Sequence, residues 1–195
     1  MNFSANVMLI DVALLNGAID GARAALSSVL GRTLPDLDLP AWLSYLALDA
    51  GLREGENEIQ VILIRDDATC SLKGCSPSEL EHLRGQACRT PLGEFVFAEA
   101  SPAGMTDTED LFMDLMTLAL DAKSVKSLTL LPDGNTYGNR VAERLQELLK
   151  DKEAAVREKP FLLTLEKPAV AACFRRDSLV YSLLRTWGVR ADEFA

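Results

Sequence analysis

The stretch VKSLTLLPDGNTYGNRVAERLQELL, residues 125–149, decides the fold predicted for this chain of 195 residues. Residues 127–131 form an apolar run that predicts a buried strand, and the Pro-Asp-Gly-Asn sequence at 132–135 predicts a sharp turn. An amphipathic helix is expected to open near Thr136. Open α/β sheets are built from such units and bind ligands outside the carboxyl ends of their strands. We therefore expect functional residues around this turn.

Segments with strand and helix patterns alternate along the rest of the chain. The other apolar runs that predict strands are residues 6–10, 58–65, 93–98 and 161–165. The segments with helical spacing are residues 12–30, 40–52, 76–85 and 106–122, and residues 175–188 contain a further amphipathic helix. Strands that alternate with helices favour a parallel sheet with right-handed crossovers. The sequence thus predicts one domain over residues 1–195, a three-layer, Rossmann-like α/β/α sandwich with a mainly parallel sheet of about five strands.

Two of these helices carry recognisable start and stop signals. Gly31 follows the helix at 12–30 and is expected to terminate it as the C′ residue. Ser76 is expected to cap the helix at 76–85, with Pro77 in its first turn and Glu79 three residues after the cap.

The charge balance argues against several classes of function. The chain carries 29 acidic and 20 basic side chains, a net charge of −9, which disfavours a generic polyanion-binding surface. It has no GxxxxGK[ST] sequence and no GxGxxG after a strand, so the common nucleotide fingerprints are absent. No apolar run approaches the roughly 18–20 residues that span a bilayer, and the N-terminal stretch lacks the basic region of a signal peptide. We expect a cytoplasmic protein without a membrane partner.

The cysteines and the single histidine offer a weak metal-site pattern. Cys70, Cys75, His82 and Cys88 lie in one short segment, and three thiols with one imidazole can bind zinc. The usual CxxC spacing is absent, so reduced thiols without a metal are the favoured alternative. His82 lies in an expected exposed helix, which favours a surface histidine over a catalytic base.

Acidic residues provide the stronger candidate site. Asp11 ends the first strand and Asp133 follows the fourth, so both should lie at the carboxyl end of the sheet. Asp110 and Asp114 share one face of the helix that leads into the fourth strand. Converging carboxylates suit Mg²⁺ or Mn²⁺, which can activate water for phosphodiester cleavage. The alternative is that these acids form no functional cluster, because acids are common in this chain and are favoured at the first turn of a helix.

Three segments together resemble the PIN/NYN nuclease superfamily. They are LIDVALLN (residues 9–16), DTEDLFMDLMTLALDA (107–122) and LTLLPDGNTYGNRVAERL (128–145). The resemblance implies an α/β/α sandwich whose carboxylates bind Mg²⁺ or Mn²⁺ and cleave RNA. It assigns metal-binding and catalytic roles to Asp11, to Asp114 or Asp110, and to Asp133. Asn135 would orient substrate or water.

The chain also departs from the pattern of that superfamily. Asn16 stands further from Asp11 than the family's Asn does from its acid, and the turn reads Pro-Asp-Gly-Asn-Thr-Tyr without a second acid. Two helices, rather than one, separate the first two expected strands. We therefore expect either a weak metal-dependent ribonuclease or a relative that binds RNA without cleaving it.

The C-terminal segment FRRDSLVYSLLRTWGVRADEFA, residues 174–195, supports a different class of function. Arginines accompany aromatic residues there, a combination enriched in protein interfaces. The residues concerned are Arg175, Arg176, Tyr181, Arg185, Trp187, Arg190 and Phe194. This pattern predicts a non-catalytic binding module or a homo-oligomer that assembles through the last helix. A helix that packs on the sheet with solvated arginines is the alternative.

Overall fold

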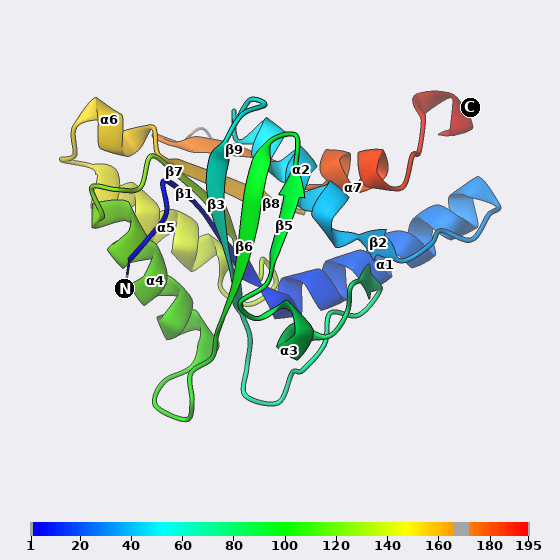
Figure 1. Ribbon diagram of the computed structural model, residues 1–195, viewed down its shortest axis with the longest axis horizontal. Helices are drawn as coiled ribbons and strands as arrows, with labels where there is room; N and C mark the ends of the chain where they lie inside the picture. The colour runs from blue at the N-terminus through cyan, green and yellow to red at the C-terminus, as the bar shows by residue number, and fades with distance from the viewer. Residues whose placement is uncertain (1, 166–171, 195) are drawn as a thin grey trace.

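The computed structural model describes residues 2–165 and 172–194, and a twisted sheet runs through the centre of the molecule (Figure 1). The strands are β1 (Asn6–Asp11), β2 (Leu37–Asp38), β3 (Asn57–Ile64), β4 (Cys75–Ser76), β5 (Ala87–Thr90), β6 (Gly93–Ala100), β7 (Ser127–Leu131), β8 (Pro160–Thr164) and β9 (Arg175–Ser178). The helices are α1 (Val12–Leu30), α2 (Leu39–Asp49), α3 (Leu80–Leu83), α4 (Thr108–Asp121), α5 (Gly138–Leu149), α6 (Ala154–Arg157), α7 (Val180–Thr186) and the 3-10 turn η1 (Ala191–Phe194).

The main sheet has the order β5-β6-β3-β1-β7-β8-β9 among the described residues. Every neighbouring pair is parallel except β5 and β6, which are antiparallel. The predicted mainly parallel α/β sheet is confirmed, and the five expected strands form its centre. The sheet is wider than expected because β5 and β9 extend its two edges. Their sequences, ACRT and RRDS, are short and polar as edge strands often are, so they lack the apolar run that marks a strand.

Helices cover both faces of the sheet, which gives the predicted three layers. Helices α4 and α5 cover one face, and α1, α2 and α7 cover the other (Figure 1). The central strand β1 supplies both apolar clusters by alternation: Met8 and Ile10 face α1 and α2, whereas Val7 and Leu9 face α4 and α5. A strand buried on both faces must be apolar, as β1 is from Val7 to Ile10.

The first two helices begin at aspartates that cap them. Asp11 accepts from the backbone N–H of Ala13 at the start of α1, and Gly31 ends that helix in the left-handed conformation (φ 62°), as predicted. Asp38 accepts from the N–H of Ala41 at the start of α2. Helix α2 then packs against α7, where the indole N–H of Trp42 donates to the buried Ser182 hydroxyl at 2.9 Å.

The predicted helix over residues 76–85 is wrong in extent. Ser76 is not an N-cap, because it belongs to β4 and pairs with Asp38 of β2. A cis peptide bond joins it to Pro77. The backbone N–H of Leu72 bonds to the carbonyl of Ser78, and a bridge pairs Ser71 with Glu79, so the helical part shrinks to Leu80–Leu83.

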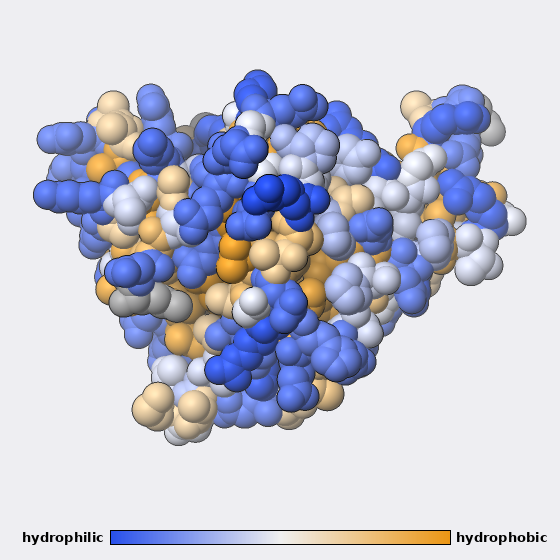
Figure 2. Space-filling view, in the orientation of Figure 1, coloured by the Kyte–Doolittle hydropathy of each residue, from blue (hydrophilic) through white to orange (hydrophobic). Residues whose placement is uncertain are grey.

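Hydrophilic residues cover most of the face in Figure 2, and hydrophobic residues show between them near its centre and on the left of the view. Among the described residues, no helix is both long and apolar enough to cross a membrane.

The close approach of β6 to β3 requires a glycine at position 93. Its φ of 132° is unfavourable for other residues, and a Cβ atom there would clash with the backbone carbonyl of Asn57, its partner in β3. We expect Gly93→Ala to lower the free energy of unfolding by about 2–4 kcal/mol, measured by urea denaturation. Gly17→Ala is the matched control, because Gly17 lies exposed in α1 with no atom near its missing Cβ. It should stabilise by roughly 0.5–1 kcal/mol. Equal effects of the two substitutions would contradict this account.

Candidate functional site

A cavity of about 290 Å³ lies at the carboxyl end of the central strands. We call it the switch-point pocket, and it is lined by Asp11, Ala13, Asp66, Asp107, Thr108, Glu109, Asp133, Thr136 and Tyr137. The chain proceeds from β1 to β3 and β6 on one side, then returns to place β7, β8 and β9 on the other. Ligands of open α/β sheets bind where the strand order reverses in this way. The pocket therefore lies where this topology favours a binding site.

Asp11 forms the floor of the pocket and is only 1% exposed. One carboxylate oxygen, Oδ1, accepts from the Ala13 N–H at 2.7 Å, and Oδ2 accepts from the Tyr137 hydroxyl. Burial raises the pKa of Asp11, hydrogen bonds from Tyr137 and Ala13 oppose the rise, and the charge of nearby Asp133 adds to it. The net pKa lies above the usual range of an aspartate. Burial also raises the pKa of Tyr137, so the phenol keeps its proton and acts as the donor.

Asp133 organises the turn between β7 and α5. Its Oδ1 accepts from the N–H of Asn135 at 3.1 Å, and its Oδ2 accepts from the Thr136 hydroxyl at 2.9 Å. Its backbone carbonyl accepts from the N–H groups of Thr136, Tyr137 and Gly138. Because these donors converge on one carbonyl, the regular helix begins at Gly138 rather than near Thr136 as the sequence suggested.

Three further acids line the pocket and were not singled out from the sequence. Asp66 follows β3, and hydrogen bonds from the side chain and backbone of Thr69 lower its pKa. Asp107 caps α4 by accepting from the N–H of Asp110 at 2.8 Å. Glu109 forms an ion pair with Arg140 at 2.5 Å. Together with Asp11 and Asp133, these residues give the pocket a strongly acidic lining.

The structure brings together only part of the predicted site. Asp11 and Asp133 share the pocket, but Asp110 and Asp114 are exposed on α4 and do not line it. Asp110 instead accepts from the Thr106 hydroxyl at 3.1 Å. Asn135, predicted to orient substrate, is also exposed outside the pocket lining.

The orientation of α4 about its own axis explains why Asp110 and Asp114 do not line the pocket. Phe112 and Met116 face the core, and Glu109 precedes Phe112 by three residues, which places it on the inner side. Asp110 and Asp114 lie on the opposite side, in line with the exposed Leu118. The spacing of Glu109 from Phe112 and Met116 was thus the sequence signal that identifies the inward-facing acid.

Neither predicted metal site is assembled as a complete set of ligands. Within residues 2–165 and 172–194, no group of three or more His, Cys, Asp or Glu side chains is arranged to hold a metal ion. For the zinc candidates, Cys70 is exposed whereas Cys75 is buried, and burial raises the pKa of the Cys75 thiol to about 12. Asn16 is also engaged elsewhere, because it holds the backbone of Ser71 and Lys73.

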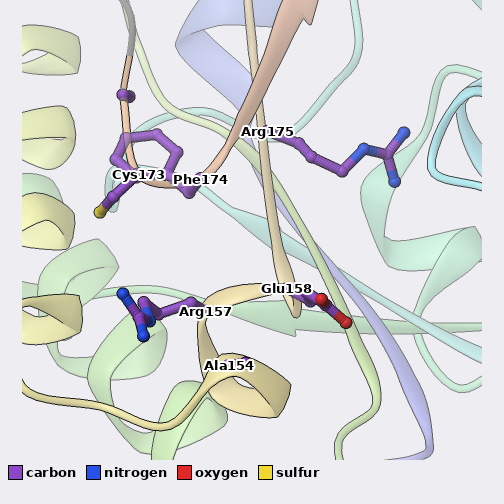
Figure 3. Close-up of a pocket in the computed structure, with 7 residues that line it drawn as sticks. Ala154, Arg157, Glu158, Cys173, Phe174 and Arg175 are labelled. Carbon is purple, nitrogen blue, oxygen red and sulfur yellow. The ribbon is translucent and has the colours of Figure 1, made fainter.

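A second cavity, of about 370 Å³, lies at the opposite end of the sheet, near the amino ends of β8 and β9 (Figure 3). Cys173 and Phe174 line one side and Arg157 another. The Arg175 side chain extends away from them in this view and donates to the backbone carbonyls of Asp49 and Ala50 at 2.7 and 2.9 Å. The guanidinium of Arg175 therefore holds the end of α2. Fewer charged side chains point into this cavity than into the switch-point pocket.

The C-terminal segment packs largely against the body of the domain. Trp187 is 6% exposed and its indole N–H donates to the Pro35 carbonyl at 3.1 Å, so it is a core residue rather than a surface one. Arg185 lies 3.7 Å from Asp49. Tyr181 and Phe194 remain exposed, and self-association through them stays a prediction.

The fold and the pocket define a three-layer α/β domain with an acidic cavity at the switch point of a parallel sheet. The chain belongs to a family of unknown function, DUF6621, whose model matches residues 1–194. No curated protein and no solved structure matches it.

The buried carboxylate should make stability depend on pH. Since the folded pKa of Asp11 is raised, the native state binds more protons than the unfolded chain between about pH 3.9 and that raised pKa. Stability conferred by this group therefore falls as pH rises through that window. Asp11→Asn keeps an oxygen that can cap α1 and has no such titration.

We therefore expect the free energy of unfolding of Asp11→Asn to rise relative to that of wild type when the pH is raised from 4 to 7. Urea denaturation at both pH values measures this difference. Asp110→Asn, at an exposed site on α4, is the control with the same charge change. The prediction would be contradicted if the free energies of unfolding of wild type and Asp11→Asn differed by the same amount at both pH values.

Proposed function

We propose that the switch-point pocket binds a hydrated divalent cation, Mg²⁺ or Mn²⁺, between Asp11 and Asp133. Through this cation it would bind a phosphodiester, such as that of RNA, without efficient cleavage. The observation that carries the proposal is Asp11 itself, a carboxylate 1% exposed at the end of the central strand. Asp133 lies near enough for its charge to raise the pKa of Asp11.

The charge of the pocket supports a cation rather than a free anion as the first ligand. Five carboxylates line the pocket, and the nearby Arg140 is paired with one of them, Glu109. Such a lining repels a free phosphate. A Mg²⁺ ion usually keeps several waters and is held by one or two carboxylates together with phosphates of the substrate. Asp11 and Asp133 match this requirement in ligand chemistry and in number.

The hydrogen bonding of the same two residues supports binding over cleavage. Each carboxylate already accepts two hydrogen bonds from the protein, and no third acid of the described residues completes a ligand set with them. We therefore assign no catalytic step to the pocket. The resemblance of three segments to the PIN/NYN superfamily supports RNA as the phosphodiester, and the missing second acid of the turn supports weak or absent activity.

Titration calorimetry with Mn²⁺ tests the cation site. We expect saturable binding to wild type, and binding weakened at least about 10–100-fold in Asp11→Asn and Asp133→Asn, because loss of an outer-shell partner alone has an effect of that size. Asp110→Asn and Asp114→Asn are matched controls, because they remove equivalent charges from the exposed side of α4. Absence of binding at millimolar Mn²⁺, or equal losses in the controls, would rule out this site.

A single-stranded RNA oligonucleotide tests the second ligand. Fluorescence anisotropy should show binding that needs Mn²⁺ or Mg²⁺, is abolished by EDTA and is weakened by Asp133→Asn. Incubation of the same RNA should release little more product with wild type than with Asp11→Asn. Binding that persists in EDTA would contradict the cation-bridged contact, and rapid cleavage that depends on Asp11 would make the protein an efficient nuclease instead.

A further inference from the structure

We draw no further inference here: the strongest candidate, the exposed outer face of α1 formed by Gly17, Gly21, Ala24, Ala25, Ser28 and Val29, is a stripe of uncharged and mostly small residues, and nothing in the described part of the structure shows what covers it.

Discussion

Burial of the Asp11 carboxylate is the constraint on which the arrangement of the pocket depends. Strand β1 is apolar on both faces because helices cover both, and its last residue is a charged group that water barely reaches. A buried charge is costly unless it is hydrogen-bonded. The structure meets this need from two directions: the first turn of α1 supplies the N–H of Ala13, and the turn before α5 supplies the Tyr137 hydroxyl. The position of both helices is thus tied to one side chain.

Much of this architecture could be predicted from local sequence patterns. The core strands are apolar runs, and each run is visible without knowledge of its neighbours. Once the strands are placed in the usual order for such folds, Asp11 and Asp133 must meet at one end of the sheet. They do meet, because β1 and β7 are neighbours. The prediction succeeded because local apolar runs identified the strands, and the usual strand order then placed the residues at their carboxyl ends.

Predictions failed where the decisive contact is distant in sequence or depends on the rotation of a helix. Asp110 and Asp114 share a face, but only the positions of Phe112 and Met116 reveal that this face points to solvent. The bond between Tyr137 and Asp11 joins residues 126 positions apart and leaves no local signal. The edge strands β5 and β9 are short and polar, and their pairing partners, rather than their composition, make them strands.

The sequence of the turn after β7 and the internal hydrogen bonds of the pocket are physically linked. An acid at position 135 or 136 would lie beside Asp133 and near Asp11, and such a cluster of like charges needs a cation to be stable. Thr136 places a hydroxyl there instead, which donates to Asp133, and the next residue does the same for Asp11. These two hydroxyl groups therefore stabilise the neighbouring carboxylates without a cation. Any cation that enters the pocket must compete with the donors that the protein already provides.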